Sequence, residues 1–319
     1  MVGIMKLILE DPMVNDLLAF AKTNPSVAEV VDHDLYKEIC KHTSLEIFDN
    51  SSELLVLGQM LALAPSLQSI TIYNPTFSIP TALFARELAK SKSLNTVKLS
   101  ILSFESTAEN PGNPIFASGF ARELVKLESL HTVQFSRCVL DKFFIPTLTV
   151  LAELQSLRTI NLYNIMDNMD NGEMPYKLGP KAHEGILEVA RELVKFKSLD
   201  TVNFGNSNLS NVAIELSKIL VSSTSIAKIG MVACSLGDCG LDVAKVFFES
   251  GQSYNVNMGN NFRRYPEIKA KISEMAIDHK ATNPNHDEFN DLVQAFIPVN
   301  PLVELIGDYV ALSEVVIEL

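Results

Sequence analysis

Hydrophobic and polar residues follow two successive periods between residues 182 and 206. Over residues 184–197 the apolar side chains fall at helical spacing, with charged side chains between them, which predicts an amphipathic helix. After a short link, Val202 and Phe204 are two residues apart, so they share one face of a strand. A single helix and a short strand cannot bury these apolar faces alone, so the pattern predicts that further copies stack against them.

The copies can be aligned along most of the chain. Leading leucines or their equivalents are 27, 36, 27, 42, 27 and 27 residues apart, which defines a period of 27 with insertions of nine and fifteen residues. Helices repeat at the same phase, as FARELAKSKSL at 84–94, FARELVKLESL at 120–130 and VARELVKFKSL at 189–199. Seven parallel strands are therefore predicted within 66–74, 93–101, 129–137, 156–164, 198–206, 225–233 and 252–260.

These segments resemble leucine-rich repeats, whose pattern is L-x-x-L-x-L followed by a polar or cysteine position. The stretch CSLGDCGLDVAKVF at 234–247 resembles the ribonuclease-inhibitor-like subclass, and NSNLSNVAIELSKIL at 206–220 is similar but lacks the glycine. The resemblance covers residues 44–261. It implies an α/β leucine-rich repeat solenoid with a curved parallel sheet inside and helices outside.

Both ends of the chain differ from the repeats. Residues 1–43 carry no repeat and are expected to form an N-terminal helical cap with helices at 12–22 and 27–42. SLEIF at 44–48 is expected to be an additional degenerate strand, followed by a helix at 53–64. Residues 262–319 are expected to form a C-terminal helical cap, with helices at 265–280 and 286–296. Within it, IPVNPLVELIGDYV resembles the opening of an F-box, so this segment is either a hydrophobic cap or a recruiting motif.

Two insertions interrupt the repeat, at 103–114 and 166–180. The first is rich in proline, glycine and asparagine, which predicts a loop. The second resembles a calcium loop, but Met169 and Leu178 occupy positions where ligands are needed, so no calcium is expected. Both follow a strand and are predicted to lie on the same rim, either as part of a binding surface or as tolerated loop growth.

Composition narrows the function classes. A net charge of −12 disfavours nucleic acid, and no apolar run approaches the ~20 residues of a membrane span. The four cysteines are expected to be reduced, two of them at equivalent buried positions, which favours a cytoplasmic, reducing compartment. Because no nucleotide, hydrolase or metalloprotease motif is present, we expect a non-catalytic protein without a cofactor or metal. We also expect a monomer.

Outward positions of the sheet remain as candidate binding residues. In the seven predicted strands, the two positions flanking the last apolar residue point away from the core, and none is acidic. Amphipathic tyrosines on such a neutral to mildly basic concave face suit a protein partner, although serine, threonine and asparagine also simply suit a solvated sheet. The predicted partner-binding residues, centred on 156–164 and 198–206, are Tyr73, Lys98, Arg137, Arg158, Asn161, Tyr163, Asn164, Asn203 and Asn206.

Two function classes remain. The first is a protein-interaction module, whose irregular repeats are similar to those that intracellular bacterial pathogens deliver into the host cell cytosol. The second is a ubiquitin-ligase adaptor that uses its C-terminal helices as an F-box-like recruiting segment.

Overall fold

A parallel sheet and a layer of helices make up the computed structural model, which describes residues 4–8, 36–37, 40–48, 54–73, 79–100, 114–138, 144–165, 180–252 and 254–282. Within these ranges nine strands pair in chain order, each parallel to the next. They are β1 (Ile4–Ile8), β2 (Ser44–Phe48), β3 (Ser69–Tyr73), β4 (Thr96–Ser100), β5 (Thr132–Ser136), β6 (Thr159–Tyr163), β7 (Thr201–Gly205), β8 (Lys228–Gly230) and β9 (Asn255–Asn257).

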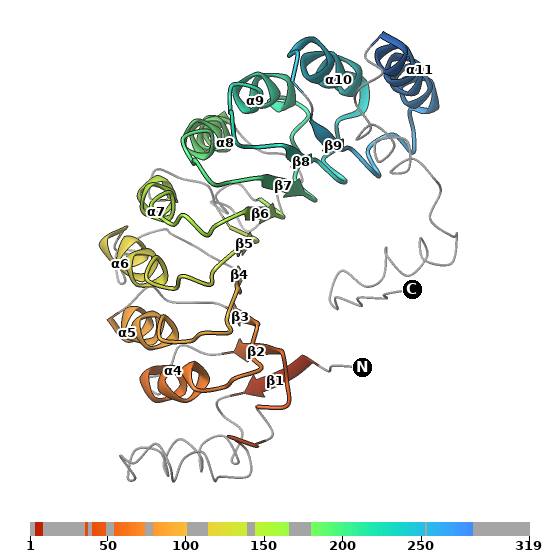
Figure 1. Ribbon diagram of the computed structural model, residues 1–319. Helices are drawn as coiled ribbons and strands as arrows, with labels where there is room; N and C mark the ends of the chain where they lie inside the picture. The colour runs from red at the N-terminus through yellow and green to blue at the C-terminus, as the bar shows by residue number, and fades with distance from the viewer. Residues whose placement is uncertain are drawn as a thin grey trace.

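Helices alternate with the strands from β2 onward. They are α4 (Leu54–Ala62), α5 (Ile79–Leu88), α6 (Pro114–Leu124), α7 (Phe144–Leu151), α8 (Pro180–Leu193), α9 (Ala213–Leu220), α10 (Gly240–Glu249) and α11 (Pro266–Thr282), with a 3₁₀ turn η1 (Gly237–Cys239) before α10. In Figure 1 the units follow an arc, with the strands on its inner side and the helices on its outer side. Strands ~4.8 Å apart beside helices ~8–10 Å apart produce such a bend.

The observed register confirms the repeat period. Ser69 pairs with Thr96, Thr96 with Thr132, and Thr159 with Thr201, so the offsets between strands equal those between the leading leucines, insertions included. The repeated helix segments end at one phase as well, because α5, α6 and α8 close at Leu88, Leu124 and Leu193. The seven predicted strands are thus confirmed as parallel neighbours, and so is the additional strand at 44–48.

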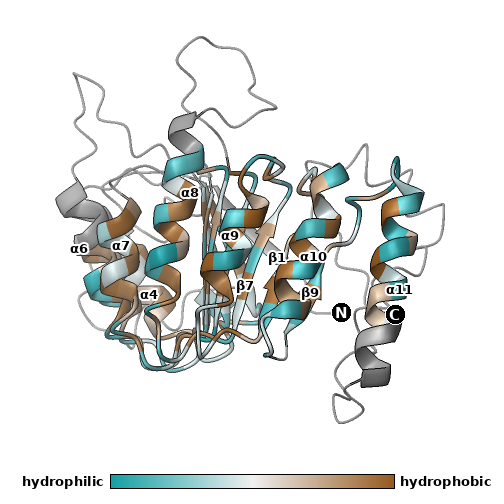
Figure 2. Ribbon diagram, turned by 90° about the horizontal axis from the view of Figure 1, so that it is seen from above, coloured by the Kyte–Doolittle hydropathy of each residue, from teal (hydrophilic) through white to brown (hydrophobic). Residues whose placement is uncertain are grey.

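The core lies between the sheet and the helices. Two inward rows cross strands β2 to β9, and none of their side chains is more than 2% exposed: Leu45, Ile70, Val97, Val133, Ile160, Val202, Ile229 and Val256, then Ile47, Ile72, Leu99, Phe135, Leu162, Phe204, Met231 and Met258. Figure 2 shows hydrophobic and hydrophilic stripes on the helices that cover this core. Each unit therefore completes the core of its neighbours.

Hydrogen bonds outside the strands also join successive units. The carbonyl oxygen of His131 accepts the N–H groups of Arg158 and Thr159, at 2.8 and 2.9 Å. The Arg158 carbonyl in turn accepts those of Asp200 and Thr201, both at 2.9 Å. The serine before each leading leucine adds a side-chain bond to the preceding unit, such as Ser129 Oγ to Leu94 O at 2.6 Å and Ser225 Oγ to Phe196 O at 2.7 Å. These bonds keep the units in one register.

Some expectations at the element ends need correction. β1 lengthens the sheet within a region expected to be only helical, because Ile4–Ile8 pairs in register with β2. Helix α8 spans Pro180–Leu193 rather than 184–197, since its last predicted turn forms the link to β7. The helix at 53–64 is confirmed as α4, and that at 265–280 as α11. The predicted helices at 12–22 and 286–296 lie outside the described residues, as do 103–113, 166–179 and the F-box-like segment, and only part of 27–42 is described.

Candidate binding face and pocket

The side of the sheet away from the helices forms a surface of aligned side chains, which we call the strand face. One row crosses its middle and a second row lies two residues further along each strand. The middle row comprises Glu46, Thr71, Lys98, Gln134, Asn161, Asn203, Gly230 and Asn257; the second comprises Tyr73, Ser100, Ser136, Tyr163, Gly205 and Val232. The predicted outward alternation is confirmed.

Accessibility differs along this face. Thr71 and Gln134 are only 8% exposed although they lie at outward positions of the sheet. Asn206 and Asn257 are exposed, and Asn161, Asn203 and Tyr163 are half-buried. The polar groups most open to a partner therefore lie over β6 to β9.

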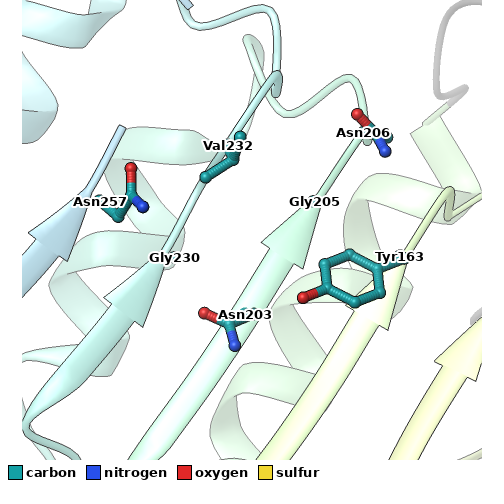
Figure 3. Close-up of a pocket in the computed structure, with 7 residues that line it drawn as sticks. All are labelled: Tyr163, Asn203, Gly205, Asn206, Gly230, Val232 and Asn257. Atoms are coloured by element: carbon teal, nitrogen blue, oxygen red, sulfur yellow. The ribbon is translucent and has the colours of Figure 1, made fainter. Parts of the chain in front are cut away.

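A pocket occupies that part of the strand face. It has a volume of about 260 Å³ and is lined by Tyr163, Asn203, Gly205, Asn206, Gly230, Val232 and Asn257. Figure 3 shows Tyr163 and Val232 on opposite sides of the strand that carries Gly205, with Asn203 and Asn206 along that same strand. Side chains from β6, β7, β9 and the end of β8 thus surround a floor that contains two glycines.

The two glycines allow neighbouring side chains to lie flat on the sheet. A Cβ atom at Gly205 would be 2.4 Å from Cδ1 of Tyr163, and one at Gly230 would be 2.2 Å from Oδ1 of Asn203. Distances this short do not occur between real side chains, so the Tyr163 ring covers Gly205 and the Asn203 carboxamide covers Gly230. Tyr163 therefore lies at an outward position, as the sequence predicts, and its ring packs on the sheet over Gly205.

Asparagine carboxamides supply the polar groups of the pocket. Asn203 Nδ2 donates to Asn161 Oδ1 at 2.7 Å, so the Asn203 oxygen turns toward Gly230. Asn257 Oδ1 accepts the Gly259 N–H at 2.9 Å, which leaves its Nδ2 group to the surface. Each carboxamide can donate and accept, so the site can bind uncharged polar groups such as peptide amides.

Two predicted binding asparagines have a structural explanation. The residue directly after β5, β6 and β7 has a left-handed backbone: φ is 55° at Arg137, 52° at Asn164 and 53° at Asn206. Asparagine tolerates this conformation better than most residues. The N–H groups of Arg137, Asn164 and Asn206 bond to Tyr163 O, Gly205 O and Val232 O, each at 2.9 Å. The left-handed turn therefore explains why asparagine occurs at positions 164 and 206, and no bound partner is needed for that explanation. Asn206 also lines the pocket.

The structure does not bring Arg158 to Tyr163. Arg158 precedes β6, and its Nη1 donates to the carbonyl oxygens of Gln155 at 2.7 Å, Leu157 at 3.2 Å and Ser198 at 3.1 Å. Five residues of extended chain separate it from Tyr163 by ~16 Å. Lys98 on β4 and Tyr73 on β3 lie two and three strands from β6, the strand of Tyr163. The structure groups Asn161, Tyr163, Asn203 and Asn206, and separates Tyr73, Lys98 and Arg158 from them.

An acidic residue also lies in the middle row. The register continues this row from Thr71 to Glu46 on β2, which is only 9% exposed. The strands β3 to β9, which correspond to the seven repeat strands of the sequence analysis, carry no acidic residue in the middle row, whereas the additional strand β2 carries Glu46. The description of the whole face as neutral to mildly basic is therefore wrong near β2. Among the residues around the pocket the description holds, because none of its lining residues carries a charge at neutral pH.

Gly230, Val232 and Asn257 were placed on outward positions by the sequence but not among the predicted binding residues. The feature of the sequence that could have identified them is the pair of glycines, Gly205 and Gly230, at outward positions of the adjacent strands β7 and β8. Each strand from β2 to β7 has a side chain in the middle row, and β8 has Gly230 there. Missing side chains on adjacent strands indicate a hollow.

Two of the four cysteines are buried core residues. All four are free, and Cys138 and Cys234 are buried, as their equivalent positions predicted. Burial raises the pKa of both thiols from 9.0 to about 12, against a smaller lowering by backbone hydrogen bonds. Cys234 Sγ donates to the carbonyl oxygen of Phe204. These thiols are protonated core groups at neutral pH.

Among the described residues, no group of three histidine, cysteine or carboxylate side chains is arranged to hold a metal ion. Within the same ranges, no helix combines the length and the apolar character needed to cross a membrane. No known protein family model matches the chain, and no curated protein is significantly similar to it.

Proposed function

We propose that this chain is a non-catalytic protein-interaction module of the leucine-rich repeat type, ribonuclease-inhibitor-like in subclass. Support for the repeat type comes from the buried L-x-x-L-x-L positions, whose register repeats across β3 to β8. Support for the subclass comes from the segment 234–247, in which η1 leads directly into the full helix α10. In this proposal the units form a curved solenoid with terminal caps.

The partner binds the strand face over β6 to β9. The observation that carries this proposal is the pocket, in which three asparagines and a tyrosine surround two glycines. The carboxamides of Asn206 and Asn257 in the lining can donate to and accept from a partner backbone, and tyrosine is enriched among the residues that dominate binding energy. The lining contains no carboxylate, imidazole, amine or thiol, which favours binding over acid–base or nucleophilic chemistry.

The cytoplasm of a host cell is the proposed site of action, with the chain delivered there by an intracellular bacterium. This rests on the resemblance of the irregular repeats and on the free, protonated core thiols, which suit a reducing compartment. The adaptor alternative depends on residues 297–310, which lie outside the described residues, and it stays a prediction.

Partner capture by matched tyrosine variants tests the proposed function. The immobilised chain is incubated with a lysate of cultured animal cells, and retained proteins are compared for wild type, Tyr163→Ala and Tyr73→Ala. Both tyrosines are half-buried in the second row, but Tyr73 lies three strands away on β3, ~14 Å from the pocket. Tyr163→Ala is expected to weaken partner binding by about 1–3 kcal/mol, with a much smaller effect from Tyr73→Ala.

Two further variants complete the design. Lys245→Ala alters an exposed side chain on α10 and should retain the partner fully. The double variant Arg158→Ala, Tyr163→Ala should be no weaker in binding than Tyr163→Ala alone, because Arg158 bonds to carbonyl groups away from the pocket. Full retention by Tyr163→Ala together with loss by Lys245→Ala would transfer the binding site to the helices and refute the proposal.

A further inference from the structure

The pocket over β7 and β8 is small and uncharged, and these two properties restrict its occupant. Its volume of about 260 Å³ is below the ~300–1,000 Å³ of typical small-molecule sites. One large side chain fits such a space, whereas a nucleotide or a folded element does not. Building on the proposed function, the question is which side chain of the partner enters.

The absence of charged residues in the lining disfavours an acidic or basic side chain of the partner. None of the seven lining residues is charged, and the charged group nearest along β8 is Lys228, whose Nζ lies 3.4 Å from Oδ2 of Asp200. This ion pair lies at the beginning of β7 and β8, and each charge is balanced by the other. A partner carboxylate or amine in the pocket would lose water without gaining an opposite charge, which is costly.

The apolar walls favour a ring. The Tyr163 ring lies flat over Gly205, and Val232 stands on the other side of the same strand. Adjacent strands are ~4.8 Å apart, so a ring seated against Val232 would lie one strand spacing from the Tyr163 ring. That separation falls within the ~4.5–7 Å over which aromatic pairs attract.

The rim supplies hydrogen bonds to the chain that carries the ring. Asn206 and the Nδ2 group of Asn257 reach the pocket from opposite sides (Figure 3). Their carboxamides match the donor and acceptor of a peptide group. We infer that the pocket binds a phenylalanine or tyrosine side chain of an extended partner segment, with the flanking peptide groups bonded by these asparagines.

Capped amino acids test this inference without knowledge of the partner. The probes are the N-acetyl, N′-methylamide derivatives of phenylalanine, tyrosine, glutamate and lysine, together with methyl glucoside. Binding is followed on the whole chain through the backbone amide NMR signals of Gly205 and Gly230. The phenylalanine and tyrosine probes should shift both signals, and the charged probes should need about tenfold higher concentration because the site offers no counter-charge.

Paired variants locate the effect. Gly205→Ala places a methyl group where the Tyr163 ring lies and should weaken binding of the phenylalanine probe about fivefold, whereas Ser136→Thr adds a methyl group to the same row on β5 and should change it less than about twofold. Thermal melting checks that both fold, and Tyr163→Leu replaces Gly205→Ala if the latter does not.

Three results would overturn the inference: a charged probe that binds as tightly as phenylalanine, methyl glucoside that shifts the glycine signals at lower concentration, or no probe that shifts them at all. If partner capture still depends on Tyr163 in any of these cases, only the aromatic occupant is wrong and the proposed function stands. If the aromatic probes bind but partner capture is insensitive to Tyr163→Ala, the proposed binding face is wrong and the aromatic preference of the pocket stands.

Discussion

Leu199→Ala tests the stacked core at the centre of the chain. Leu199 is fully buried and leads into β7, with the equivalent Leu157 on one side, also 0% exposed, and Ile226 on the other, 3% exposed. Removing three carbon atoms forfeits about 2.4 kcal/mol of transfer free energy at ~0.8 kcal/mol per buried carbon. The cavity left between units adds to this loss, so the free energy of unfolding should fall by about 2–5 kcal/mol.

Leu63→Ala is the matched control. Leu63 is 44% exposed at the end of α4, so the same substitution there should cost less than about 1 kcal/mol. Urea unfolding followed by circular dichroism gives both values. Hydrogen exchange should also accelerate first in β6, β7 and β8, because each unit contacts only its neighbours.

Equal shifts of the urea midpoint for the two variants would refute the reasoning. Faster exchange spread evenly over all strands, at unchanged total stability, would contradict the nearest-neighbour transmission.

Two further predictions concern buried polar groups. Asn261→Ala should cost about 1–3 kcal/mol for each amide left unpaired, because Asn261 Oδ1 accepts the N–H groups of Cys234 at 2.7 Å and Leu236 at 3.3 Å; the exposed Asn257→Ala, compared in the same urea titration, should cost far less. The pKa of Cys138 and Cys234 is raised from 9.0 to about 12 in the folded protein. As the pH rises, these thiols therefore ionise in the unfolded chain before they ionise in the folded one. The contribution of the protonated thiols to stability is complete below pH 9 and is lost between pH 9 and 12. Iodoacetamide at pH 8 should accordingly label these two cysteines more slowly than Cys40 and Cys239, and equal native labelling rates would contradict their burial.

The strand register could be predicted because the inward pattern allows only one alignment. Val202 and Phe204 must stay in the core, and a slip by one residue would turn both outward. Matching pairs on neighbouring strands therefore fix each offset, whatever the length of the insertion between them. β1 could not be predicted in this way, because Ile4–Ile8 has no leading S-L and lies 40 residues before its partner in β2, which does not match the period of 27.

The pocket was only partly predictable. Alternation places Tyr163, Asn203 and Asn257 on one side of the sheet, but it does not tell which neighbour each side chain covers. Tyr163 lies over Gly205, a residue 42 positions later, and that contact depends on the register across the long insertion. Asn206 was selected for its chemistry, whereas its left-handed backbone provides a second reason for an asparagine.

Site-specific photo-cross-linking tests the binding face most directly. A benzophenone side chain is introduced at Asn257, which is exposed on the strand face, or at Glu215, which is exposed on α9, and each protein is irradiated with the captured partner. A cross-link from position 257 and none from position 215 is the predicted result. A cross-link from position 215 alone would place the partner on the helices and contradict the account.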